Sequence, residues 1–404
     1  MIYYQGQLDR LYQYLFIAAC FFLPLTVVAN NIAIWLITII WVISGDYAFK
    51  FNKIKKNKLA LSSIIFFSIH ILGLLWSENM DWSLEILRKM LPFLLVLPIL
   101  LTITRSENIK FYILAFLIAI GISESASYLI WFGFIEPFKY ATIENPTPVM
   151  SHISYNPFLA FAIYIVLNEL LSRKKMKPYE RGAYTFFLLT MTFNMFITGG
   201  RAGQVMFFSS LVLLAFQYFK SSQLKAVITS FLLIITIFIS AYYLSPVFQQ
   251  RVDMGYNEIS NYDTKRDVES PYIHTSVGLR INYFLNSWEI FESSPIYGVG
   301  TGDFPSEYSK INKVNSPFST DTSHPHNMYM LLLTQLGLIG FISLMSMFYY
   351  QIRIAISSDN QNIKNIGLAI PILFSIINWS DSYLLGHYTA NLFILFSAFI
   401  YMKN

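Results

Sequence analysis

The chain has 404 residues, of which 55% are hydrophobic and only 13% are charged, and its formal net charge is +5. Soluble proteins carry about a quarter charged residues, so this composition excludes an ordinary soluble domain. Apolar runs of roughly 18 to 22 residues recur along the chain, which is the length that crosses a bilayer as a helix. The sequence therefore predicts an all-α polytopic membrane protein, with basic loops rather than a nucleic-acid partner behind its positive charge.

The first apolar run begins close to the N-terminus and contains Cys20, the one cysteine of the chain. A single cysteine excludes an internal disulfide, and a packing role is expected for it. The run is too long for the hydrophobic region of a cleavable signal peptide, so we expect it to stay in the membrane.

The apolar runs predict about twelve membrane-spanning helices. In chain order they cover 11–30, 32–49, 59–75, 91–104, 110–132, 155–172, 183–199, 202–219, 226–244, 326–350, 364–379 and 388–402. The expected organisation is nine helices over 1–244, one large loop over 245–325, and three helices over 326–404.

The basic connections set the expected orientation. Residues 50–58 carry five lysines, and the stretch 171–181 carries three lysines and two arginines. Loops rich in Lys and Arg stay cytoplasmic. Both termini are then cytoplasmic, and the loop 245–325 lies on the outer, periplasmic side.

The large loop contains one amphipathic segment, 277–291. Its apolar residues recur at helical spacing and predict a helix that lies at the membrane interface. They are Leu279, Ile281, Phe284, Leu285 and Trp288.

Polar residues gather on the outer side of this topology. Five of the six histidines fall in outer connections or at their edges, and the sixth, His70, lies in the outward half of its span. Charged and polar groups near a bilayer are costly and tend to be functional. An outer site is therefore expected.

Arg201 stands in the outer sequence TGGRAG. It is either an interfacial anchor with a snorkelling side chain or an anion-binding residue. The preceding Gly199 and Gly200 allow close backbone approach to a ligand, which favours anion binding. Arg280, on the amphipathic segment, has the same two interpretations.

His324 and His326 stand just before the span 326–350. A zinc site needs three or four ligands and this pair supplies two, so we expect no metal and no cofactor. A neutral imidazole would instead take a proton from a sugar hydroxyl as a general base. Asn327 either belongs to the site or caps the following helix.

Three glycines punctuate GVGTGDF, residues 298–304. The spacing is not that of a dinucleotide-binding loop, and no alternation of strands and helices surrounds it. A tight turn that shapes the outer loop, and that sets Asp303 and Phe304, is the better interpretation.

At these residues the sequence resembles the O-antigen ligase and O-antigen polymerase superfamily of bacterial envelope glycosyltransferases. The motif is an H-N pair, nine residues and G-x-x-G, here His326-Asn327, then Gly337 and Gly340. The G-R-A-G stretch from Gly200, the glycine turn 298–304 and the large outer loop agree with it. The motifs cover roughly 185–345 and the topology covers the whole chain.

The resemblance implies a glycosyltransferase-C-like fold in the bacterial inner membrane and a metal-independent, inverting transfer of glycan from undecaprenyl diphosphate at the periplasmic face. His326 would be the general base that activates the acceptor. Arg201 and Arg280 would hold the diphosphate leaving group, since guanidinium grips phosphate oxygens by paired hydrogen bonds. His324, Asn327, Asp381 and Gly200 are expected to support substrate binding.

The sequence departs from the family pattern at Gln335, where many members have an acidic residue. A carboxylate is therefore absent at that position. Asp381, in the outer turn before the last span, is a candidate for orienting a histidine, and its alternative is a solvated turn residue.

We expect an O-antigen ligase, whose acceptor is a sugar of the lipid A core. The alternative is an O-antigen polymerase, whose acceptor is another lipid-linked repeat. A polysaccharide transporter is disfavoured, because its ionisable residues would lie at mid-bilayer in two related halves.

Overall fold

The computed structural model describes residues 2–173, 175–263 and 265–402, and these residues form helices joined by turns, with no strand among them. In chain order the α-helices are α1 (Ile2–Phe22), α2 (Val27–Ile43), α3 (Tyr47–Lys56), α4 (Lys58–Leu72), α5 (Met80–Leu94), α6 (Val96–Ile103), α7 (Ile109–Trp131), α8 (His152–Ser172), α9 (Pro178–Ile197), α10 (Arg201–Tyr218), α11 (Gln223–Leu244), α12 (Pro246–Ser260), α13 (Ser276–Ser293), α14 (Phe304–Asn315), α15 (Met328–Ile356), α16 (Gln361–Ile377) and α17 (His387–Ile400). Three short 3-10 turns lie at η1 (Gly73–Trp76), η2 (Ser106–Asn108) and η3 (Pro271–His274).

Six helical segments are long and apolar enough to cross a membrane, and three shorter apolar helices accompany them within the described chain. The six are Lys58–Trp76, Met80–Ile103, Ser106–Trp131, His152–Ser172, Gln223–Leu244 and Met328–Ile356. The shorter three are Val27–Ile43, Gln361–Ile377 and His387–Ile400. Every span predicted from the sequence overlaps a helix, and the all-helical, polytopic class is confirmed at this level. The first predicted span, 11–30, is wrong in its bounds, because α1 ends at Phe22 and α2 begins at Val27.

The fourth predicted span, 91–104, begins too late. The helical segment starts at Met80 and continues through α5 and α6 to Ile103. The helical turns left out of the predicted span carry charged residues, which lower the hydropathy without ending the helix. Glu85 accepts from Arg88 at 2.8 Å and lies 3.5 Å from Lys89, so the charges pair along the helix surface.

Helices α8 and α10 form the tightest pair, because small residues let their backbones meet. A Cβ on Gly203 would come within 2.3 Å of the Asn156 backbone. Asn156 itself is fully buried. The start of α10, with Arg201, is thereby fixed beside the start of α8.

Helix α15 is broken at Gly337, where φ is +60° and ψ is −157°. The segment 294–300, which includes the start of the glycine turn, inserts at this break. Val299 N donates to Thr334 O at 2.9 Å, and Leu338 N donates to Pro295 O at 2.9 Å. The glycine turn and the H-N-x9-G-x-x-G motif are therefore joined by backbone hydrogen bonds.

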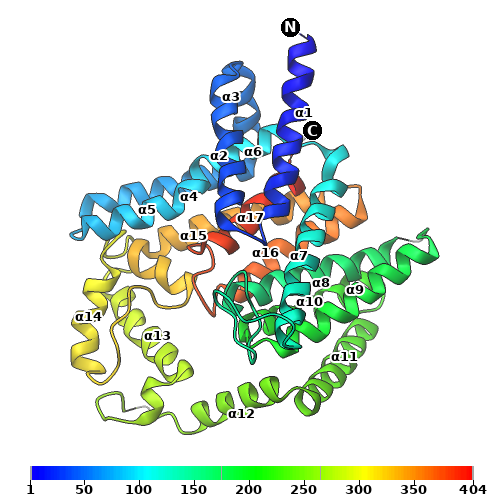
Figure 1. Cartoon of the computed structure of the whole chain (residues 1–404). Helices are drawn as coiled ribbons and strands as arrows, with labels where there is room; N and C mark the ends of the chain where they lie inside the picture. The colour runs from blue at the N-terminus through cyan, green and yellow to red at the C-terminus, as the bar shows by residue number, and fades with distance from the viewer. Residues whose placement is uncertain (1, 174, 264, 403–404) are drawn as a thin grey trace.

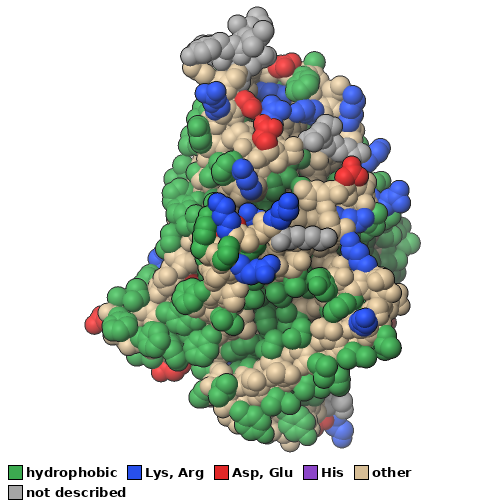
Figure 2. Space-filling model, turned by 90° about the vertical axis from the view of Figure 1, so that its right-hand side faces the viewer, with side chains coloured by type: hydrophobic (Ala, Val, Ile, Leu, Met, Phe, Trp, Pro, Cys, Tyr) green, Lys and Arg blue, Asp and Glu red, His purple; other side chains and the backbone are tan. Residues whose placement is uncertain are grey.

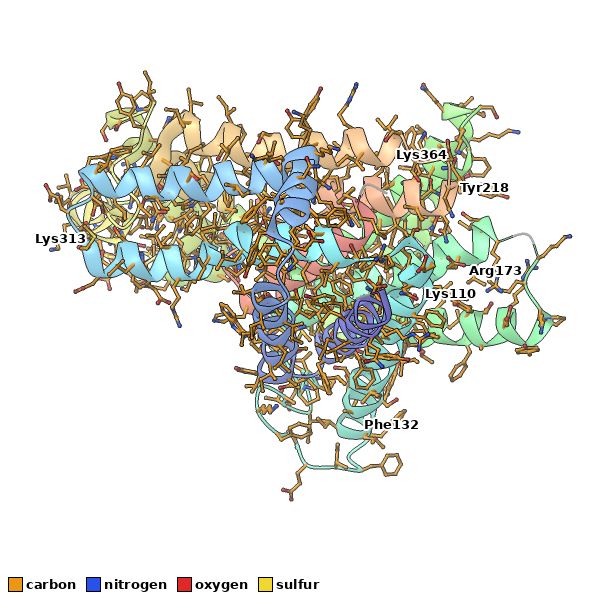
Figure 3. The ribbon with its side chains drawn as sticks, turned by 90° about the horizontal axis from the view of Figure 1, so that it is seen from above. Lys110, Phe132, Arg173, Tyr218, Lys313 and Lys364 are labelled. Carbon is orange, nitrogen blue, oxygen red and sulfur yellow. The ribbon has the colours of Figure 1, made fainter. Side chains whose placement is uncertain are left out.

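The stretch 245–325 is mostly helical, with α12, α13 and α14 arranged one after another (Figure 1). Seen from above, Lys313 of α14 lies at one end of the molecule, and Arg173, Tyr218 and Lys364 lie at the other (Figure 3). On the face shown in Figure 2, Lys and Arg side chains lie mainly in the upper half, above a broad hydrophobic surface.

The predicted helix over the amphipathic segment 277–291 is confirmed by α13. This helix, however, buries its polar face. Asn282, Asn286 and Ser287 are fully buried, while Trp288 on the apolar face is 42% exposed. Asn286 Nδ2 donates to Ser316 Oγ at 2.8 Å. The buried face therefore contacts neighbouring protein through hydrogen bonds, while the apolar residues Leu279, Ile281, Phe284 and Leu285 are partly buried.

Candidate functional site

A cavity of about 190 Å³ lies where the starts of α8, α10 and α13 meet α12 and the turn before α17. Three arginines line it: Arg201, Arg251 and Arg280. The cavity thus collects cationic side chains from three helices that are far apart in the sequence.

The arginine donors are incompletely satisfied. Arg201 Nε and Nη2 are buried without a hydrogen-bond partner among the described residues, and Arg280 Nε is in the same state. Arg201 Nη1 lies 3.9 Å from Glu258 Oε2, and Arg280 Nη1 donates to Ser276 Oγ at 2.8 Å. Buried donors without acceptors are unfavourable, so the cavity is suited to an anion that would accept from them.

Glu258 has a second bond that explains its position. Its Oε2 accepts from the backbone N of Val277 at 3.0 Å, in the first turn of α13. One buried carboxylate on α12 therefore holds the start of α13 beside Arg201 and leaves the other donors of that guanidinium unpaired.

Gly200 and Gly199 make the cavity narrow. A Cβ on Gly200 would meet the His152 carbonyl at 2.5 Å, and a Cβ on Gly199 would lie 3.2 Å from Arg251 Nε. Both glycines line the cavity. The close approach predicted at Gly200 exists, but within the described structure it is to α8.

Arg251 was missed by the sequence interpretation, although it lines the same cavity. It lies in a polar part of α12, where no motif marks it. His152, at the start of α8, was noticed only as an outer histidine, and Asn145 Nδ2 contacts its Nδ1 at 2.8 Å. Only the packing of α12 against the ends of α9 and α10 singles out Arg251.

His326 lies beside the carboxylate of Asp381, which is part of the turn 380–383 before α17. Its Nδ1 is 3.3 Å from Asp381 Oδ1, and its ring stacks on Tyr283 with centroids 5.7 Å apart. His326 has φ of +49°, which turns the chain sharply before α15. Ser380 and Tyr383, on either side of Asp381, line the arginine cavity.

His324 lies on the same carboxylate, with Nδ1 4.0 Å from Asp381 Oδ1 and its ring centroid 4.2 Å from that of His326. Burial lowers the pKa of His324 to about 4, and His326 and Lys89 add to this effect while Asp381 opposes it. Burial by itself would raise the pKa of Asp381, but the contacts with His326 and His324 hold it below its ordinary value.

Asp381 is therefore no solvated turn residue, since its side chain is 15% exposed and faces two imidazoles. Asp381 also adds a third possible metal ligand to the two histidines. His324, His326 and Asp381 offer three ligand atoms within 4.8 Å of one another, where the sequence offered only two.

Asn327 acts as the cap of α15. Its Oδ1 accepts from Tyr329 N at 3.0 Å and from Met330 N at 3.1 Å. This is the capping alternative, and it occupies the oxygen that a substrate would otherwise use. Gln335 is fully buried beside the break in α15, and both of its amide atoms lack a partner in the described structure.

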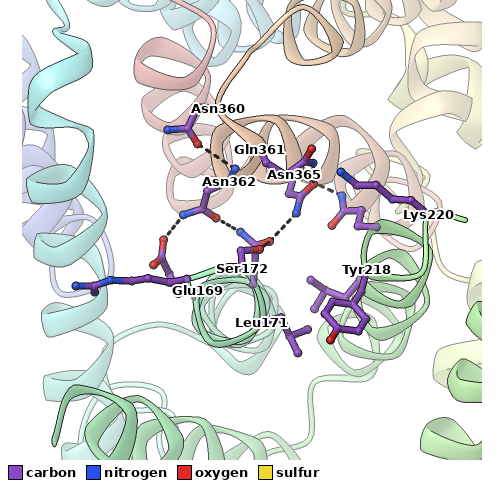
Figure 4. A pocket seen from close by; sticks show the side chains of 13 residues that line it. Glu169, Leu171, Ser172, Tyr218, Lys220, Asn360, Gln361, Asn362 and Asn365 are labelled. Atoms are coloured by element: carbon purple, nitrogen blue, oxygen red, sulfur yellow. Dashed lines mark hydrogen bonds between the residues drawn. The ribbon is translucent and has the colours of Figure 1, made fainter. Parts of the chain in front are cut away.

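A larger polar pocket, of about 570 Å³, lies at the opposite ends of α8 and α10 (Figure 4). Two of its carboxamides bond to each other, with Asn365 Nδ2 donating to Asn168 Oδ1 at 2.9 Å, and Gln217 Nε2 donates to the backbone carbonyl of Asn365 at 3.1 Å. These groups hold α8, α10 and α16 together, in contrast to the unpaired donors of the arginine cavity.

Comparison with known families agrees with the predicted resemblance. Residues 186–345 match a family model described as O-antigen ligase, and this stretch includes Arg201, Arg280 and His326 but not Asp381. A comparison with curated proteins found no match to the chain. Residues 186–345 are therefore similar to the O-antigen ligase family, which supports the predicted resemblance to the O-antigen ligase and polymerase superfamily.

Proposed function

We propose that this protein is an O-antigen ligase, which transfers a glycan from undecaprenyl diphosphate to the lipid A core at the periplasmic face of the bacterial inner membrane. The observation that carries the proposal is the pairing of two half-sites across the turn 380–383. One is the arginine cavity with its unpaired donors, and the other is His326 against Asp381.

The arginine cavity would bind the diphosphate of the donor. Arg201, Arg251 and Arg280 can donate to phosphate oxygens in pairs, and the narrow, partly buried site strengthens each bond. As the bond between sugar and phosphate breaks, negative charge grows on the leaving diphosphate. Fixed cations at that point stabilise the transition state without a metal ion.

His326 would remove the proton of the acceptor hydroxyl. With Nδ1 turned to Asp381, the Nδ1 proton stays on that side and Nε2 keeps a free lone pair. The acceptor oxygen then bonds to the anomeric carbon, the diphosphate leaves from the opposite face, and the proton goes to Nε2. A single displacement of this kind inverts the anomeric configuration.

The experiment is deletion of the gene followed by gel analysis of lipopolysaccharide and of lipid-linked glycan. Loss of all O-antigen from the lipid A core, with lipid-linked polymer still made, is the result expected for a ligase. A core that carries one repeat would instead identify an O-antigen polymerase, which has the same donor and a lipid-linked acceptor.

The chemistry is tested by complementation and by transfer in vitro. His326→Ala should abolish transfer and leave membrane insertion intact, whereas His274→Ala, on an exposed outer histidine, should complement fully. Transfer should persist in EDTA. Transfer by His326→Ala, or loss in EDTA that Mg²⁺ restores, would contradict the mechanism.

A further inference from the structure

We propose that His324, His326 and Asp381 form a binding site for a divalent transition-metal ion, best fitted by Zn²⁺, and that the bound ion inhibits the enzyme. The ligand atoms would be the two imidazole Nδ1 atoms and Asp381 Oδ1. The inhibitory part rests on the proposed role of His326, and the binding part does not.

The three ligand atoms lie within 4.8 Å of one another, a spacing that must contract to form a zinc site. Zinc binds His nitrogen and carboxylate oxygen at about 2.0–2.2 Å, so two ligand atoms of a tetrahedral site lie roughly 3.3 Å apart. His326 Nδ1 and Asp381 Oδ1 are already at 3.3 Å. His324 Nδ1 is at 4.0 Å from the same oxygen, so a contraction of about 0.7 Å would complete this edge.

The nitrogen atoms concerned have no other partner. His324 Nδ1 and His326 Nδ1 are both buried, and neither makes a hydrogen bond of ordinary geometry in the described structure, although Asp381 Oδ1 lies 4.0 and 3.3 Å from them. The rings themselves are about one third exposed, at 32% and 33%, so the cluster lies near the protein surface. Two imidazoles and one carboxylate match the donor preference of zinc.

The charged residues around the cluster limit its affinity for a metal ion. Asp381 supplies one negative charge, while Lys89 lies near enough to His324 to disfavour additional positive charge there. Glu85 Oε1, 3.5 Å from Lys89 Nζ, offsets part of that effect. We therefore expect reversible binding of one ion rather than a permanently filled structural site.

Inhibition follows from the tautomer that a bound metal ion imposes on the ring of His326. A metal ion on Nδ1 of His326 uses that lone pair and displaces the Nδ1 proton, so the neutral ring carries its proton on Nε2. Nε2 is the atom proposed to accept the proton of the acceptor hydroxyl. A ring that already holds a proton there cannot act as the base.

The experiment uses the full chain in lipid nanodiscs, stripped with EDTA and then freed of chelator. Zn²⁺ is titrated in competition with a chromophoric chelator, and X-ray absorption at the zinc edge reports the ligands. We expect one ion per chain with two imidazoles bound. Asp381→Asn and His324→Ala should each weaken binding by more than about tenfold.

His274→Ala is the matched control, because this exposed histidine lies outside the cluster, and its zinc affinity should equal that of the wild type. Thermal unfolding of each variant, measured without zinc, separates lost ligands from misfolding. Equal zinc affinity in the wild type and in folded Asp381→Asn, or an absorption spectrum without imidazole, would overturn the site.

A transfer assay tests the second part. Zn²⁺ at the binding concentration should inhibit transfer, and EDTA should restore it. If zinc binds as expected and transfer continues unchanged, the inhibitory role and the assignment of His326 as base are overturned. If zinc does not bind while His326→Ala is inactive, the metal site is overturned and the proposed function stands.

Discussion

Asp381 and His326 are 55 residues apart in the chain and come within 3.3 Å because the turn before α17 folds against the start of α15. A carboxylate on Nδ1 selects one tautomer and raises the basicity of the ring. In the proposed mechanism Asp381 is a positioning residue for the base. The sequence shows both residues but not their distance.

The first prediction concerns Asp381→Asn. Transfer should fall by about 100-fold or more in kcat, with little change in the KM for the donor, because the amide no longer favours the required tautomer. The pH profile of kcat should also change, which a purely structural defect would not cause. Asp267→Asn, on an exposed carboxylate of the outer loop, is the control. An unaltered pH profile would contradict the role.

The second prediction concerns Arg251, the arginine that no motif marks. Arg251→Ala should raise the KM for the donor by about 10- to 100-fold, because a charge-assisted hydrogen bond contributes roughly 1.5–3 kcal/mol. Arg251→Lys should recover part of this through charge alone. Arg173→Ala, at the far end of α8, should leave the KM unchanged (Figure 3). Unchanged donor KM in Arg251→Ala would remove this residue from the site.

At the scale of elements, the break in α15 decides how the outer loop is held. Gly337 adopts a backbone conformation open almost only to glycine, and the freed backbone groups of Leu338 and Ile339 bond to Pro295 and Ile296. From the sequence, Gly337 is a tolerable glycine inside a helical run. Its function in joining two motifs emerges only when the segment 294–300 is placed beside it.

The third prediction follows from this junction. Gly337→Ala should lower the thermal stability and the yield of folded protein, because its Cβ would lie 2.4 Å from the Ile296 carbonyl carbon and because φ is positive. Gly182→Ala is the matched control, since Gly182 lies in α9 with open space around it. Thermal unfolding in detergent is the measurement. Equal melting temperatures for both variants would refute the proposed importance of the break.

At the scale of the whole molecule, Lys313 of α14 lies at one end, and Arg173 and Lys364 lie at the other (Figure 3). The positive charges predict an orientation in which the stretch 171–181 is cytoplasmic and 245–325 is periplasmic. The fold places the arginine cavity and the pocket of carboxamides at opposite ends of α8 and α10.

The fourth prediction tests that orientation with introduced cysteines. The chain has one cysteine, Cys20, which is buried, so Cys20→Ala provides the background. In intact spheroplasts a membrane-impermeant maleimide should label Lys313→Cys and spare Lys175→Cys. After lysis both variants should react. Labelling of Lys175→Cys before lysis, without Lys313→Cys, would invert the topology.

The sequence by itself determined the class of this protein, most helix positions and the family resemblance, because hydropathy and short motifs are local properties of the chain. It also identified His326, Arg201 and Arg280 as candidates. It placed the start of the fourth span too late, since paired charges on α5 lower hydropathy without ending a helix. Only the tertiary structure added Arg251 and brought Asp381 to the histidines, because such contacts join helices whose spacing no local pattern encodes.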